Sequence, residues 1–368
     1  MRLAVRIFFL LVTLLAALAI GAGVLFYKAW HSPGPLVADT TIVIDPGSHT
    51  VTIGRDLEQA GIVADWRLFV LGVKLFSNGK PLRAGEYKFG AGMSPEQVMH
   101  MLVSGATYAR RVTVPEGYTT AQAVRLVSSA EGLVGDMPSE LPSEGQLLPE
   151  TYFYTRGETR QVMLRRMSDA MQGALTKLWA ERAAGLPYAN PGEALVLASI
   201  VEKETSLPVE RARIAGVFVN RLRRDMLLQS DPTVIYVVAN GQGPLGRDLS
   251  SADLQVKSPY NTYLVKGLPP GPICNPGLAS IQAVLHPMAT KDLFFVADGS
   301  GGHAFAQTLA EHNRNVAAYR KFLAQQGGTQ PSGAAAIVAD PPPASSAAES
   351  AFGSRARASG ATPSSIAP

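Results

Sequence analysis

The strongest pattern along the chain is an uninterrupted apolar run near its N-terminus. Residues 7–27 are 21 positions without a charge, preceded by Arg2 and Arg6 and followed by Lys28. A helix of that length can cross a hydrocarbon core about 30 Å thick. A cleaved signal peptide is the alternative, but the run extends beyond the apolar core of such a signal. We therefore predict an uncleaved single-pass anchor over residues 1–30, with a cytoplasmic N-terminus because two arginines precede the span.

Shorter patterns of apolar positions follow the anchor. Residues 31–40 hold Pro33, Gly34 and Pro35 and are predicted to form a linker. Alternation then predicts strands, and apolar residues three or four positions apart predict helices. The predicted order is β-α-α-β-α, with strands over 41–45 and 84–89 and helices over 54–60, 65–76 and 94–105. This small module, residues 41–109, favours a binding or spacer role because it holds no cluster of acids or histidines.

Residues 110–325 carry patterns of a larger α+β domain. The predicted strands are 111–114, 293–297 and 303–307, the last two joined by a glycine-rich hairpin loop. The predicted helices are 120–131, 161–185, 190–205, 208–225, 233–239, 277–286 and 308–325. Residues 326–368 are mostly Ala, Ser, Pro and Gly. They are predicted to be disordered because they offer too little apolar surface to bury.

The helix predicted over residues 190–205 is unlike the others because it is apolar on every side. Asn190 can cap it, and Pro191 suits its first position. The apolar stretch 194–201 predicts a buried helix, and Glu202 follows directly. Burial raises the pKa of a carboxyl, which suits a general acid working near neutral pH. The alternative is a solvated Glu202 at a frayed helix end.

Composition excludes several kinds of site. The net charge of +4, from 33 basic and 29 acidic residues without a dense basic patch, gives no reason to expect a nucleic acid partner. A single cysteine, Cys274, excludes an intramolecular disulfide and a CxxC metal site. The six histidines lack metal-ligand spacing, and no HExxH, Walker-type or G-x-S-x-G motif occurs. No metal or other cofactor is predicted, and carboxylate chemistry remains.

That chemistry can use one acid or two. A glycosidase normally needs a second carboxylate, about 5 Å or about 6.5–9.5 Å from the first. Glu204 is predicted to face away from Glu202. Three other acids would serve only if the fold brought them in, namely Glu144, Glu150 and Asp231. In a one-acid mechanism, Glu202 protonates the leaving oxygen and then removes a proton from a substrate hydroxyl that attacks intramolecularly.

The stretch Leu197-Ala-Ser-Ile-Val-Glu-Lys-Glu-Thr205 is similar to the signature of the endolytic murein transglycosylases, the MltG or YceG-like family. Eight further stretches resemble this family in its order, at residues 115–117, 144–152, 220–222, 228–236, 260–263, 267–277, 286–287 and 294–303. The resemblance implies an inner-membrane protein with a LysM-like module over residues 41–109 and an extracytoplasmic catalytic domain over 110–325. It places the catalytic glutamate at Glu202.

The resemblance also implies an activity and partners. The family cleaves peptidoglycan glycan strands between MurNAc and GlcNAc, leaves a 1,6-anhydroMurNAc end, and is expected to terminate nascent strands near peptidoglycan synthases. Polar or aromatic residues on family-like stretches are candidates to bind the sugar. They are Glu144, Gln229, Asn261, Tyr263 and His303. The alternative is that Asn261 holds a turn and His303 ends a hairpin.

Two other functions stay open on the sequence. A hydrolytic muramidase would cut the same bond with water and a second acid, and its product would be one water heavier than the anhydro product. A non-catalytic peptidoglycan-binding scaffold would depend on the LysM-like module instead of Glu202.

Overall fold

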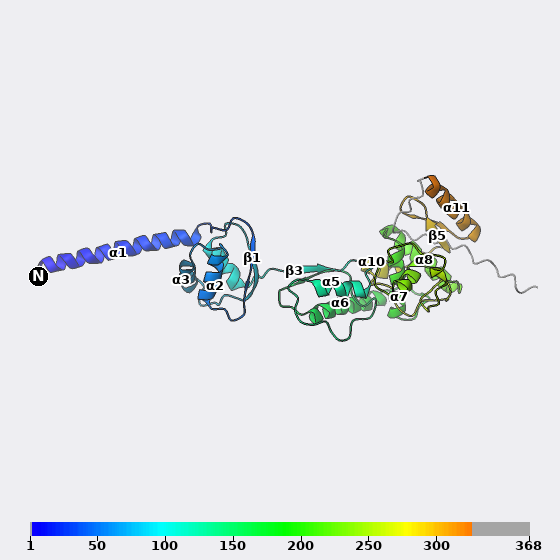
Figure 1. The fold of residues 1–368 in the computed structure, drawn as a ribbon, viewed down its shortest axis with the longest axis horizontal. Helices are drawn as coiled ribbons and strands as arrows, with labels where there is room; N and C mark the ends of the chain where they lie inside the picture. The colour runs from blue at the N-terminus through cyan, green and yellow to red at the C-terminus, as the bar shows by residue number, and fades with distance from the viewer. Residues whose placement is uncertain (1, 326–368) are drawn as a thin grey trace, which may run out of the picture. The chain divides into compact units, whose positions relative to one another are not determined.

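The computed structural model describes residues 2–325, which belong to two compact units. The first unit ends at Leu293 and the second begins at Phe294. Figure 1 labels the helices and strands. Within the described residues the strands form three separate two-stranded antiparallel sheets among many helices, so the predicted α+β class is confirmed. The tail predicted over residues 326–368 lies outside the described residues.

The N-terminal apolar run forms one long helix. Helix α1, Arg2–His31, is long and apolar enough to cross a membrane. Its C-terminal end packs into the following module, because Trp30 is only 2% exposed and joins that module's core. The Trp30 ring centroid lies 6.2 Å from that of Phe69 and 5.6 Å from that of Phe76.

The module after α1 has the predicted order of elements. Strands β1, Thr40–Ile44, and β2, Gly85–Phe89, pair antiparallel with Ile42 opposite Tyr87. The accompanying helices are α2, Thr50–Gln59, α3, Trp66–Phe76, and α4, Pro95–Ser104. The predicted linker is held to this module, because the Gly34 N–H donates to the Met93 carbonyl at 3.1 Å. The LysM-like character of the module stays a prediction.

The next part of the chain holds a strand pair covered by two helices. Strands β3, Arg110–Thr113, and β4, Thr151–Tyr154, pair antiparallel, and helices α5, Thr120–Ser129, and α6, Arg160–Ala180, share their core. The sequence did not predict β4. It is only four residues long and directly follows Pro149 and Glu150, so its alternation is too short to stand out.

The helix predicted to be buried is buried. Helix α7, Pro191–Glu204, has no exposed residue from 194 to 201, and α8, Pro208–Arg223, and α10, Leu278–Leu285, pack against it. Asn190 caps α7, because its Oδ1 accepts from the Glu193 N–H at 2.9 Å. Helix α9, Asp231–Val238, and a short 3₁₀ helix, Asp253–Gln255, complete this part of the first unit.

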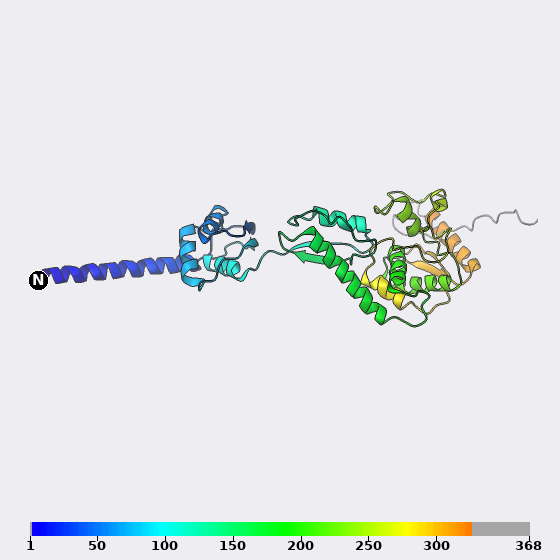
Figure 2. The ribbon, with the colours of Figure 1, turned by 90° about the horizontal axis from the view of Figure 1, so that it is seen from below.

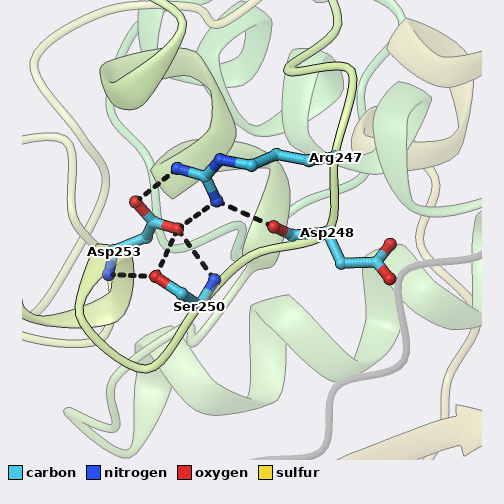
Figure 3. A network of polar contacts seen from close by, with 4 residues as sticks. All are labelled: Arg247, Asp248, Ser250 and Asp253. Atoms are coloured by element: carbon cyan, nitrogen blue, oxygen red, sulfur yellow. Dashed lines mark hydrogen bonds and ion pairs between the residues drawn. The ribbon is translucent and has the colours of Figure 1, made fainter.

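The loop before the 3₁₀ helix is held by a polar network (Figure 3). The Arg247 guanidinium binds both oxygens of Asp253, at 2.6 and 3.0 Å, and the Ser250 N–H donates to the same carboxylate at 2.7 Å. These hydrogen bonds hold the pKa of Asp253 below its usual range, with Arg247 the largest cause. The network fixes the backbone of this loop.

The second unit contains the predicted hairpin and helix. Strands β5, Phe294–Ala297, and β6, His303–Ala306, pair antiparallel, and α11, Leu309–Gln325, packs on them through Tyr319. A capping box begins α11, because Glu311 accepts from the Thr308 N–H at 3.2 Å and donates its own N–H to Thr308 Oγ1 at 3.3 Å.

Candidate active site

Glu202 lies in the last turn of α7, and its carboxyl is covered by other parts of the chain. The side chain is 6% exposed. One carboxyl oxygen, Oε2, accepts from the Gly277 N–H at 3.0 Å, and the other, Oε1, lies 3.7 Å from Nη2 of Arg211 on α8. Glu202 is therefore not solvated at a frayed helix end. Its carboxyl is oriented by one backbone donor and one cation.

A second carboxylate, which the sequence did not predict at this site, lies beside Glu202. Glu116, in the loop between β3 and α5, has Oε2 3.5 Å from the same Nη2 of Arg211. Burial and the negative charge of Glu202 raise the pKa of Glu116, whereas Arg211 opposes this rise. The Glu116 side chain is 45% exposed, so it lies at the open side of the pair. Arg211 thus bridges two acids.

Gly277, at the start of α10, contacts both acids. Its N–H is the donor to Glu202, and a Cβ built on it would overlap the carboxyl of Glu116. The φ angle of Gly277 is −74°, which any residue adopts. The requirement for glycine here is therefore one of space, not of backbone conformation.

The segment that carries Gly277 is held in place by buried hydrogen bonds. The Ser199 hydroxyl of α7 accepts from the Ile273 N–H at 3.0 Å. Asn275 is fully buried, donates its N–H to the Tyr118 carbonyl at 2.8 Å, and accepts from the Leu147 N–H through Oδ1 at 2.8 Å. Asn275 therefore joins the loop that carries Glu116 to the segment beside Glu202.

A separate buried polar group lies beyond the end of α7. Glu204 is 3% exposed and accepts a hydrogen bond from the Ser230 hydroxyl. Burial raises the pKa of Glu204 to about 8, although the bond from Ser230 opposes this. Tyr263 donates to Asp231 at 2.5 Å, and burial also raises the pKa of Asp231. Glu204, which was expected to face away from Glu202, and Asp231, one of the conditional second acids, are thus engaged with these hydroxyls.

Two of the predicted sugar-binding residues hold backbone in this structure. Glu144 accepts from the Thr120 N–H at the start of α5, at 2.7 Å, and burial raises its pKa. Asn261 is fully buried and donates to the carbonyls of Leu254 and Val256, at 3.0 and 2.9 Å. This is the turn-holding geometry that we gave as the alternative for Asn261. Contact of either residue with a substrate stays a prediction.

The other predicted sugar-binding residues have different surroundings. The Gln229 N–H donates to the Thr262 carbonyl at 3.0 Å, and Gln229 adopts a left-handed backbone conformation with φ 50°. Tyr263 is bound to Asp231, as described. His303 begins β6 in the second unit, where its ring packs edge-on against Phe295 at 5.4 Å. Their contact with a substrate also stays a prediction.

Residues that could bind a metal do not cluster in the part of the chain that the structure describes, where no three His, Cys, Asp or Glu side chains gather in a suitable arrangement. Cys274 is fully buried, and its thiol donates to the Ser199 carbonyl at 3.3 Å. Burial raises the pKa of this thiol, so Cys274 contributes packing and not a nucleophile.

A covered acid beside a second carboxylate is typical of enzymes that cleave glycosidic bonds. Residues 42–318 match the YceG-like family, and the chain belongs to that family. An endolytic murein transglycosylase from Streptococcus pneumoniae is 32% identical over 76% of this chain and 58% of that protein. One from Bacillus subtilis is 29% identical over 82% of this chain and 91% of that protein.

The chain thus spans 58% of the length of the Streptococcus relative. A crystal structure of a putative YceG-like protein from Listeria monocytogenes is also similar, with a TM-score of 0.47 and 29% identity, over 76% of this chain and 99% of that chain.

Proposed function

We propose that the protein is a membrane-anchored endolytic lytic transglycosylase. It cleaves the bond between MurNAc and GlcNAc within peptidoglycan strands and leaves a 1,6-anhydroMurNAc end. The observation that carries this proposal is the covered carboxyl of Glu202, held between the Gly277 N–H and Arg211. The names of the relatives from Streptococcus pneumoniae and Bacillus subtilis support the substrate and the reaction.

In the proposed reaction Glu202 transfers a proton twice. Its protonated carboxyl donates to the glycosidic oxygen, and the bond from that oxygen to C1 of MurNAc breaks. The Glu202 carboxylate then takes the proton of the MurNAc C6 hydroxyl while that oxygen forms a bond to C1. The proton count of Glu202 is restored, and no water is consumed. Arg211, 3.7 Å from Oε1, stabilises the carboxylate that exists between the two transfers.

A hydrolytic muramidase is a second candidate, and Glu116 is the observation that favours it. Glu116 shares Nη2 of Arg211 with Glu202 and is more exposed than Glu202. A carboxylate in that position is suited to activate water, which is the role that inverting glycosidases give to their second acid. The two reactions break the same bond and differ in the group that attacks C1.

Helix α1 is proposed to anchor the protein in the inner membrane, with its N-terminus in the cytoplasm. The apolar length of α1 and the arginines before the span support this. The catalytic part would then lie outside the cytoplasm, where peptidoglycan is. Action near peptidoglycan synthases, which terminates strand elongation, follows from this location as part of the proposal.

Product mass spectrometry tests the proposed reaction. Purified glycan strands are incubated with the wild-type protein and with Glu202→Gln, and Glu140→Gln, an exposed acid, is the matched control. We expect anhydro products from the wild type and the control, and a loss of about 10²–10⁴ in rate with Glu202→Gln. Products one water heavier would favour the muramidase. Normal turnover by Glu202→Gln would overturn both reactions.

A further inference from the structure

We propose that α3 lies in the headgroup region of the membrane that α1 crosses, with one apolar face against the lipid. This rests on the membrane anchoring proposed above. Leu68, Leu71 and Leu75 are 39%, 44% and 56% exposed. Their spacing of three and four residues places them on one face of α3, which we call the leucine stripe. A contiguous exposed apolar stripe on a folded module marks a contact surface.

The leucine stripe borders the face of α3 that contacts α1. At about 100° per residue, Gly72 and Phe76 fall between the stripe and the buried face of α3. Gly72 lies against the Trp30 ring with no room for a Cβ, and the Phe76 ring centroid is 6.2 Å from that of Phe26. Figure 2 shows α3 lying across the end of α1. The apolar surface of α1 therefore continues onto α3.

The depth of this contact follows from the length of the apolar run. Phe26 is near the end of the charge-free residues 7–27. A span of about 20 helical residues crosses a hydrocarbon core of about 30 Å, so Phe26 comes at the outer boundary of that core. Because Phe76 stacks on Phe26, the C-terminal end of α3 lies at the same depth. That depth is the interface between acyl chains and headgroups.

The charges of α3 favour lipid over other partners for the leucine stripe. Arg67 and Lys74 lie on the flank of the stripe opposite Phe76, both are exposed, and α3 contains no acid. Basic side chains beside an apolar face are typical of helices that lie in a membrane surface. Their aliphatic stems pass through the apolar layer, and their charged ends reach the anionic headgroups. Two copies of α3 packed symmetrically through the stripe would bring like charges together. We therefore assign the stripe to lipid.

Fluorescence quenching in vesicles tests this assignment on the full chain. The native Cys274 is fully buried, so an introduced exposed cysteine is labelled alone. An environment-sensitive fluorophore is placed at Leu71→Cys in the stripe, at Leu15→Cys in the middle of α1, and at Phe153→Cys, an exposed apolar position on β4. The vesicles contain phosphatidylethanolamine and phosphatidylglycerol, with nitroxides at the headgroup or in the middle of the acyl chain.

We expect headgroup nitroxides to quench most of the Leu71 fluorescence, mid-chain nitroxides to quench the Leu15 probe, and neither to quench the Phe153 probe. Adding Leu68→Gln and Leu75→Gln to the Leu71→Cys chain changes exposed side chains only and should abolish most of the Leu71 quenching.

The outcomes separate the interfacial contact from the anchor. If the Leu15 probe is quenched and the Leu71 probe is not, the interfacial role of α3 is wrong although the anchor stands. A blue-shifted Leu71 probe that resists both quenchers would indicate a protein partner on the stripe and would also overturn the assignment. An unquenched Leu15 probe would remove the anchoring on which it rests. Cleavage assays with Glu202→Gln report on the proposed reaction independently.

Discussion

At the scale of single residues, the chemistry of the site depends on two carboxylates, those of Glu116 and Glu202, which Arg211 bridges. Glu116 and Glu202 come within 3.5 and 3.7 Å of one nitrogen, and burial together with the negative charge of Glu202 raises the pKa of Glu116. Glu116 was not predictable from local pattern, because it lies in a loop far from Glu202 along the chain. The sequence marked Glu116 only through the family-like stretch 115–117, and that stretch did not indicate that Glu116 lies beside Glu202.

The role of Glu116 can be tested by removing its charge and, separately, by displacing it. For a transglycosylase, we expect Glu116→Gln and Gly277→Ala to keep anhydro products with a loss of about 10-fold or less, because Glu202 makes both proton transfers. The Ala methyl group displaces the Glu116 carboxyl without removing the N–H that binds Glu202. Rates and product masses are measured together. Loss of about 10²–10⁴ in both variants would instead assign the base to Glu116.

The buried Glu204 predicts how stability depends on pH. Its pKa is about 8 in the folded protein and near 4.5 when unfolded, so between these values only the folded state holds the proton. Stability therefore falls as pH rises from about 4.5 to about 8, by up to roughly 1.4 kcal/mol per pH unit. Glu204→Gln keeps an acceptor for Ser230 and should remove this slope. Urea unfolding across this pH range measures it, with Glu140→Gln as an exposed control.

At the scale of elements, α7 was largely predictable because its signals are local. Its cap, its proline and its apolar stretch all lie within one window of the sequence. The end of α6 was harder to predict than α7. Helical spacing extended the predicted helix to Gly185, but α6 ends at Ala180. Gly185 has φ 73°, which is outside the helical region. Pairings such as Asn275 with Leu147 depend on distant segments, and no local pattern reveals them.

Replacing Asn275 tests how the segment that carries Gly277 is joined to the Glu116 loop and to Leu147. Asn275→Ala leaves the Leu147 N–H without its acceptor in a buried site, at a cost of about 1–3 kcal/mol. The Asn275 side-chain amide also donates to the Tyr118 carbonyl in the Glu116 loop, at 3.0 Å, and this bond is lost too, so activity should fall more than global stability explains. Asn313→Ala, at an exposed position of α11, is the matched control. Equal activity per folded molecule in both variants would limit Asn275 to a stabilising role.

At the scale of the whole molecule, Trp30 connects helix α1, the proposed anchor, to the first module. It belongs to the membrane-candidate helix by sequence and to the module core by packing. We expect Trp30→Ala to cost about 3–5 kcal/mol of module stability, as for other large-to-small core changes. Faster hydrogen exchange in α3 of the full chain would report this loss. Tyr27→Ala, at an exposed position of α1, should leave α3 exchange unchanged.

The junction at Trp30 has a consequence for motion. A helix joined to a domain by a flexible tether lets that domain tumble freely above the lipid. Here the last turn of α1 is part of the module core, so an α1 that spans the membrane as proposed would rotate with the module about the membrane normal as one body. On that proposal the rotational correlation time of the module would be set by bilayer viscosity, and it should lengthen when the lipid is made more viscous.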